Sequence, residues 1–254
     1  MLGGRPLSLV AREAVSPRNY RSLVRMRALS PDFAAVARRY FLGGGAYPWC
    51  PRVRTPLGIV APALWSHHDV WTLNEVFFRE DYRARPDLRV AVDIGSNIGI
   101  SALYFLTRNR LARAYLYEPD PRNVARLRDN LAAFEARYEL AEVAVAPAGG
   151  RVEFAREPTG RYGRVGSGED SIVVESVGIR ELLERVLEHE PRIDLLKLDT
   201  EGLEEATVEA IPPELLDRID VIAFESERPA PLHADRFSHW FGNETVRLDA
   251  RGGR

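Results

Sequence analysis

The chain has 254 residues, 45% of them hydrophobic, which is enough to bury one substantial core and a small accessory region. The formal net charge of -2 gives no reason to expect a polyanionic partner. Lys197 is the only lysine and the arginines are scattered along the chain, so we expect no nucleic-acid partner. Cys50 is the only cysteine, which excludes an internal disulfide and a cysteine metal cluster.

The apolar stretch at residues 6–10 is interrupted by Arg12 and Glu13. It is too short for the core of a signal peptide and for a membrane span. We therefore expect a cytoplasmic protein without a membrane partner.

Residues 1–86 are predicted to form an accessory region. Short helices run to about Tyr40, with Asp32 as the N-cap of one of them, and a β-hairpin follows at residues 52–61. A further helix is expected from Val70 to about Phe78, because its apolar residues recur at helical spacing.

The run His67-His68-Asp69 raises the question of a metal or acid–base site. Adjacent residues of an extended segment point in opposite directions, and a dedicated metal site needs further ligands that nothing adjacent supplies. We therefore interpret the run as a capping loop, with Asp69 as the N-cap of the next helix.

A buried strand at residues 90–94 leads into a turn that bears an acid and glycines. The turn reads Asp93-x-Gly95-x-Asn97-x-Gly99 and precedes a helical pattern that extends to residue 110. Glycine lacks the Cβ atom that would keep a ligand from the backbone, and asparagine tolerates positive φ. Amides at the start of the helix favour a bound negative group. A dinucleotide-binding loop would instead need glycines at positions 97 and 100.

A second strand at residues 114–118 ends in Glu118, 25 residues after Asp93. An acid at this place in a nucleoside-binding α/β unit accepts the ribose hydroxyls. Asp120 and Pro121 are expected as the N-cap and first residue of the following helix.

The middle of the chain predicts two more strands. One covers residues 138–145, and another follows the turn at residues 149–150. The polar, glycine-bearing segment 157–170 is either a lid over a site or a connection, and the sequence leaves both open.

A third strand-to-turn motif covers residues 193–204. Lys197 and Asp199 lie on one face of its strand, since alternate residues share a face. A buried lysine needs an acidic partner, so a structural ion pair is an alternative to a functional site. Because the carboxyl ends of parallel strands share one edge of a sheet, we expect Asp93, Glu118 and Asp199 to converge.

The last part of the chain predicts a strand at residues 219–224 that ends at Glu225. The aromatic residues within 237–241 suggest one helix, and residues 245–248 suggest one strand. On this interpretation the final strand of the sheet is missing or supplied differently.

The three motifs, in this order, resemble the FkbM family of S-adenosyl-L-methionine-dependent methyltransferases, over about residues 88–226. The resemblance implies an α/β, Rossmann-like class I methyltransferase fold, with a mostly parallel sheet and helices on both faces. A methyltransferase domain at residues 87–254 would follow the N-terminal helical and hairpin extension. By position, the implied cofactor residues are Asp93, Gly95, Ser96, Asn97, Gly99 and Glu118, and the implied catalytic residues are Lys197, Asp199 and Glu201.

The resemblance further implies O-methylation of a small-molecule hydroxyl on a sugar or secondary metabolite. The loop amides would hold the carboxylate of S-adenosyl-L-methionine, and Asp93 would favour its cationic groups. Asp199 is the candidate base, and a divalent cation held by Asp199 and Glu225 is an option to which we do not commit. The alternatives are an inactive methyltransferase-like binding module and a nicotinamide oxidoreductase, the latter disfavoured by Asn97 and Ile100. The sequence does not specify the acceptor or the oligomeric state.

Overall fold

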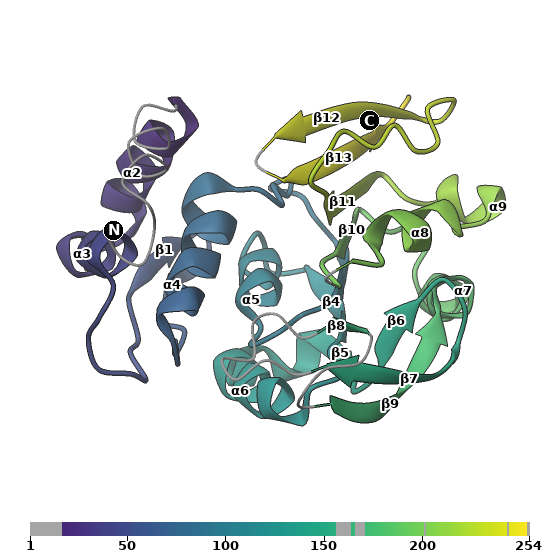
Figure 1. The fold of residues 1–254 in the computed structure, drawn as a ribbon. Coiled ribbons are helices and arrows are strands. Elements are labelled where there is room, and N and C mark those ends of the chain that lie inside the picture. The colour runs from purple at the N-terminus through teal and green to yellow at the C-terminus, as the bar shows by residue number, and fades with distance from the viewer. Residues whose placement is uncertain (1–16, 156–163, 166–170, 201, 243, 253–254) are drawn as a thin grey trace. The chain divides into compact units, whose positions relative to one another are not determined.

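The computed structural model of the protein describes residues 17–155, 164–165, 171–200, 202–242 and 244–252. The chain divides into two compact units, Met1–Arg83 and Ala84–Arg254 (Figure 1). The first consists of helices and one hairpin, and the second is built on a large sheet.

The first unit contains the predicted hairpin, in which β1 and β2 pair antiparallel. The polar side chains of the unit also bind one another: the Ser22 hydroxyl donates to Asn74 Oδ1 at 2.5 Å, and Arg25 pairs with Glu80. The elements are α2 (Pro17–Leu29), α3 (Phe33–Leu42), β1 (Val53–Thr55), β2 (Gly58–Val60), α4 (His67–Leu73) and the π-helix η1 (Asn74–Arg79).

The start of α4 differs from the prediction. Ser66 is the N-cap, and Asp69 is the third helical residue, which completes a capping box with Ser66. Asp69 Oδ2 accepts hydrogen bonds from the backbone amides of Trp65 at 2.6 Å and Ser66 at 2.8 Å. The prediction that His67 and His68 lie in an extended capping loop was wrong, because the capping box of Ser66 and Asp69 starts the helix at His67.

Asp32 stands at the N-cap position of α3, but its side chain makes no capping hydrogen bond. Its carboxylate instead accepts from the amide of Arg52 at 2.8 Å and from the Arg52 guanidinium at 2.7 Å. These bonds hold the pKa of Asp32 below its ordinary value. The predicted N-cap position is therefore confirmed, but Arg52 binds the carboxylate that would otherwise cap the helix.

The second unit is organised around a seven-stranded sheet in the order β12-β13-β11-β10-β3-β4-β5. The five strands from β11 to β5 are parallel, and β13 pairs antiparallel with β11 and β12. The predicted mostly parallel α/β sheet is confirmed. The strands are β3 (Val90–Ile94), β4 (Arg113–Tyr117), β5 (Tyr138–Ala141), β10 (Leu195–Leu198), β11 (Val221–Glu225), β12 (Phe237–Gly242) and β13 (Thr245–Ala250).

The C-terminal part of the sheet corrects the sequence prediction. The aromatic residues expected on a helix lie on β12, which forms a reversed hairpin with β13. Their i, i+3 and i+4 spacing imitates a helical stripe, but only Phe237 is buried, while Trp240 is 45% and Phe241 37% exposed. The final strand is therefore present.

The predicted strand at residues 138–145 is two strands in different sheets. β5 belongs to the large sheet, and β6 (Ala144–Ala146) pairs with β9 (Ser171–Gly178) in a four-stranded sheet ordered β6-β9-β7-β8. The strand expected after residue 150 is β7 (Gly150–Ala155). Apart from β8 (Arg164–Val165), the glycine-bearing segment 157–170 lies outside the described residues.

Helices cover both faces of the large sheet (Figure 1). The apolar sides of α7 (Ile179–His189), α8 (Glu204–Glu209) and α9 (Pro213–Leu216) pack on the face formed by Val90, Val92 and Ile94. The opposite face carries α5 (Ile100–Leu106), whose Ser101 reaches Asp93, and α6 (Pro121–Leu131) beside α5. Asp120 caps α6 and Pro121 begins it, as predicted.

Candidate functional site

The loop between β3 and α5 depends on residues that adopt left-handed backbone conformations. Gly95, Asn97 and Gly99 have φ values of 72°, 49° and 83°. A Cβ atom on Gly95 would lie 1.9 Å from the backbone oxygen of Asp199, so this position requires glycine. The close approach joins the loop after β3 to the loop after β10.

The backbone amides of this loop have acceptors within the chain. All five amides from residue 95 to residue 99 donate hydrogen bonds, at 2.7 to 3.1 Å. In this arrangement each of the five amides therefore already has an acceptor. The acceptors are Tyr117 O for Gly95 and Ser96, Glu118 Oε2 for Asn97, Asn97 Oδ1 for Ile98, and Ser96 O for Gly99.

Glu118 follows β4 and is buried, with 4% of its surface exposed. It accepts from the amides of Asn97 at 2.8 Å and Asp120 at 2.9 Å, and from Asn123 Nδ2 at 3.4 Å. Burial raises the pKa of Glu118 to about 7, even though these hydrogen bonds oppose the shift. A carboxylate offers about four acceptor positions, so this one can accept a further donor.

Lys197 on β10 lies at the centre of a buried ion-pair network. Its Nζ is 3.1 Å from Asp93 Oδ1 and 3.4 Å from Asp199 Oδ2, and it donates to Gly95 O at 2.8 Å. Its side chain is 2% exposed. Burial alone would lower the pKa of Lys197, but the charges of Asp93 and Asp199 outweigh it and raise that pKa.

Asp93 is fully buried, with a side-chain exposure of 0%. Its second oxygen, Oδ2, accepts from the Ser101 hydroxyl at 2.5 Å. Burial raises its pKa, although Lys197 and Ser101 act against this. The carboxylate expected to meet a ligand's cationic groups is thus engaged with Lys197 and Ser101 beneath the loop.

Asp199 is the more accessible acid of the network, with 29% of its side chain exposed. Its amide donates to Ile94 O at 3.1 Å, which fixes the first residue after β10 against β3. The predicted convergence is therefore present: Asp93 and Asp199 share Lys197, and Glu118 binds Asn97 of the loop that Lys197 also contacts. Glu201 lies outside the described residues.

Two residues of this region had no role assigned from the sequence. Ser101 is the second residue of α5, and its only sequence signal is a small hydroxyl in the first turn of that helix. Glu204 begins α8 and accepts hydrogen bonds from the loop that contains Asp199. Its sequence signal was its place at the end of the third motif.

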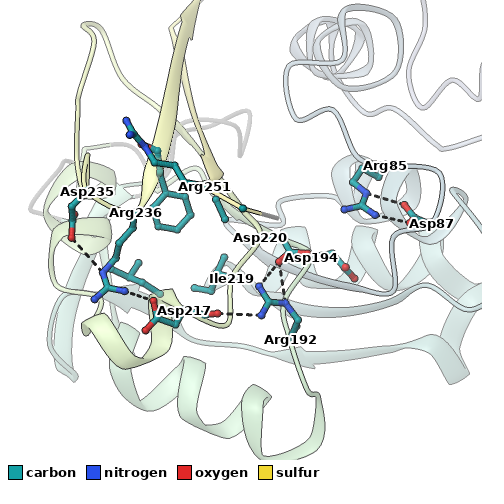
Figure 2. A pocket seen from close by; sticks show the side chains of 14 residues that line it. Arg85, Asp87, Arg192, Asp194, Asp217, Ile219, Asp220, Asp235, Arg236 and Arg251 are labelled. Atoms are coloured by element: carbon teal, nitrogen blue, oxygen red, sulfur yellow. Dashed lines mark hydrogen bonds and ion pairs between the residues drawn. The ribbon is translucent and has the colours of Figure 1, made fainter. Parts of the chain in front are cut away.

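A cavity of about 810 Å³ lies at the other end of the sheet, beside the residues that precede β10 and β11 (Figure 2). Its charged side chains pair with one another, as Arg192 does with Asp220 and Arg236 with Asp217. Ligands of open α/β sheets bind at the carboxyl ends of the strands. We therefore interpret this cavity as a surface network of ion pairs, apart from the candidate site.

Within the described residues, no group of three or more histidine, cysteine, aspartate or glutamate side chains is arranged to hold a metal ion. None of the helices in these residues has the length and apolar character needed to cross a membrane. Among the described residues, the metal option at Asp199 and Glu225 rests on two carboxylates.

Comparison with known proteins identifies a family that matches this chain. The family model described as the methyltransferase FkbM domain matches residues 93–242, more than half of the chain. A 2-O-methyltransferase NoeI from Sinorhizobium fredii is 41% identical over 70 residues, which are 28% of each protein.

Solved structures of methyltransferases also align with the chain, at low identity. One is a methyltransferase from Geobacter sulfurreducens, with 16% identity, a TM-score of 0.39, and coverage of 65% of this chain and 72% of that chain. Another is TrmK from M. capricolum in complex with S-adenosyl-homocysteine, with 14% identity, a TM-score of 0.38, and coverage of 71% and 68%. From the family match over residues 93–242, the chain belongs to the FkbM methyltransferase family.

Proposed function

We propose that this chain is an S-adenosyl-L-methionine-dependent O-methyltransferase that acts on a hydroxyl of a small molecule, such as a sugar or secondary metabolite. The observation that supports this most directly is the position of Asp199. Its partly exposed carboxylate lies at the carboxyl edge of the sheet and is joined through Lys197 to the glycine loop after β3. Family membership and the NoeI similarity agree with a methyl transfer to oxygen.

The residues at this edge fit a nucleoside cofactor. The Glu118 carboxylate can accept a ribose hydroxyl in addition to its present donors. Gly95 lets the loop after β3 lie against the backbone of Asp199, which brings the two loops of the site together. Lys197 and Asp93 act as positioning residues, because both are buried and hold the loop from beneath.

S-adenosyl-L-methionine, when bound, supplies a methyl group already activated by its sulfonium. The protein then aligns the acceptor hydroxyl with that methyl group and removes the hydroxyl proton. In this transfer Asp199 would take the proton of the acceptor hydroxyl. Lys197 keeps the Asp199 carboxylate in place at 3.4 Å.

Calorimetry is the first test of this proposal. S-adenosyl-L-methionine and its demethylated product should bind, whereas NAD should not, because positions 97 and 100 are not glycine. Transfer of a labelled methyl group to a panel of methyl glycosides and phenols would then distinguish an enzyme from an inactive binding module. Binding of NAD in place of S-adenosyl-L-methionine would contradict the proposal.

The pKa of Glu118 predicts two opposite effects of pH. With a folded pKa of about 7, above the ordinary glutamate value of 4.5, this group's contribution to stability is complete below pH 4.5 and is lost as the pH rises through about 7. The apoprotein should therefore lose about 1.4 kcal/mol of unfolding free energy between pH 6 and pH 8. Cofactor affinity should instead rise by about 10-fold over this interval, because only the carboxylate accepts both ribose and amide donors fully.

Glu118→Gln is the control for this prediction, since it removes the titration and keeps the side-chain size. Both pH trends should flatten in the variant, and cofactor binding at pH 8 should weaken by about 1.5 to 3 kcal/mol, as expected for a lost hydrogen bond to a charged group. Denaturant melts and calorimetry at pH 6 and pH 8 give the two quantities. A pH trend in affinity that persists in the variant would remove Glu118 from the cofactor site.

A further inference from the structure

The loop that carries Asp199 is held by one buried carboxylate. Glu204, the first residue of α8, is 6% exposed, and its side chain folds back over the preceding residues. Glu204 Oε1 accepts from the amide of Thr200 at 2.6 Å and from its hydroxyl at 3.3 Å. Glu204 Oε2 accepts from the amide of Gly202 at 2.8 Å. Both oxygens are thus used within the residues that directly follow Asp199.

These bonds matter because the other side of Asp199 is already fixed. Its amide binds Ile94 O, and its backbone oxygen lies against Gly95. Gly202 has a φ of 117°, so the chain turns sharply between the strand and α8. Without an acceptor at Glu204, the backbone amides of half-buried Thr200 and exposed Gly202 would lose this partner at the turn. Of the contacts described above, the Asp199 segment would then keep those to β3 and to Lys197.

The next residue, Glu205, contacts the loop that follows β11. Glu205 Oε1 accepts from the Ser226 hydroxyl at 2.8 Å, directly after Glu225 at the end of β11. The start of α8 therefore contacts both loops at the carboxyl edge of β10 and β11. Of the two acids, only Glu204 binds the backbone of the segment that follows Asp199.

We propose that Glu204 is a positioning residue for Asp199: it fixes the loop after β10 so that the Asp199 carboxylate faces the acceptor hydroxyl. This inference rests on the proposed role of Asp199 as the base. Glu204 acts in this role through the loop, because both of its oxygens bind Thr200 and Gly202. Small displacements of a catalytic group cost large factors in rate, so such a residue affects turnover more than cofactor binding.

Glu204→Gln tests the proposal, because it keeps the side-chain shape and turns one acceptor into a donor that faces an N–H group. We expect the amides of Thr200 and Gly202 to exchange hydrogen about 10-fold faster or more. Single-turnover methylation of the best methyl glycoside should slow by about 10-fold or more, with cofactor affinity within about 2-fold of wild type. Glu209→Gln, an exposed glutamate on the same helix, is the matched control and should change neither.

A double mutant separates positioning from general stability. In an Asp199→Asn background, Glu204→Gln should produce no further loss of turnover, because a residue that acts through Asp199 has nothing left to position. An independent, multiplicative loss would overturn the proposal, and so would normal turnover in Glu204→Gln. If Glu204→Gln does not fold, Glu204→Asp, which keeps the charge but shortens the reach, is measured in the same way.

The same variants distinguish failure of this inference from failure of the proposed function. Normal turnover in Asp199→Asn alone would remove Asp199 as the base. Slow turnover in Asp199→Asn together with normal turnover in Glu204→Gln would reject only the positioning role of Glu204.

Discussion

Asp199→Asn should reduce the single-turnover rate of methyl transfer by about 100-fold or more, while the affinity for S-adenosyl-L-methionine changes little. The substitution keeps the shape of the side chain and removes its charge and its capacity to take a proton. Asp199 is the accessible acid of the network, with 29% of its side chain exposed, so its removal acts on the reaction more than on the core. Rapid-quench measurement with a labelled methyl group gives the rate.

The alternative explanation for Asp199 is an ion pair with Lys197 alone. In that case the variant should lose stability and keep its turnover, because the buried lysine loses one of its counter-charges. Melting temperature and calorimetry on the same preparation separate the two explanations. A slow variant that added divalent cation restores would favour a metal held near Asp199 and Glu225 over a direct base.

Lys197→Met should lower the unfolding free energy by about 3 to 5 kcal/mol, because it leaves Asp93 buried without its counter-charge. Asp93 is 0% exposed and has only the Ser101 hydroxyl as its other side-chain partner among the bonds described above. The same change removes the hydrogen bond to Gly95 O. Urea unfolding at pH 7 measures the loss.

Two controls make this prediction specific to charge. Leu196→Met changes a neighbouring fully buried residue of β10 to a side chain of similar volume, and should cost less than about 1.5 kcal/mol. Adding Asp93→Asn to Lys197→Met removes the stranded charge and should recover part of the stability. A double variant less stable than Lys197→Met would contradict the buried ion pair.

The sequence by itself determined the order of the elements that build the site. Each of the three motifs is a buried strand followed by a turn and a helix, and these patterns depend on residues close together in the chain. The strands β3, β4 and β10 and the cap of α6 at Asp120 therefore lie where the sequence predicted them. The shared edge of Asp93, Glu118 and Asp199 followed from the rule for parallel strands.

Only the tertiary structure decided what each acid contacts. Lys197 and Asp93 are 104 residues apart, and their pairing follows from the register of β10 against β3, in which the two are direct partners. That pairing turns Asp93 from an expected ligand contact into a buried counter-charge, and leaves Asp199 as the exposed member. The β12–β13 hairpin was missed for a related reason: the aromatic spacing of residues 237–241 fits a helix locally, but the antiparallel edge offered by β13 selects a strand.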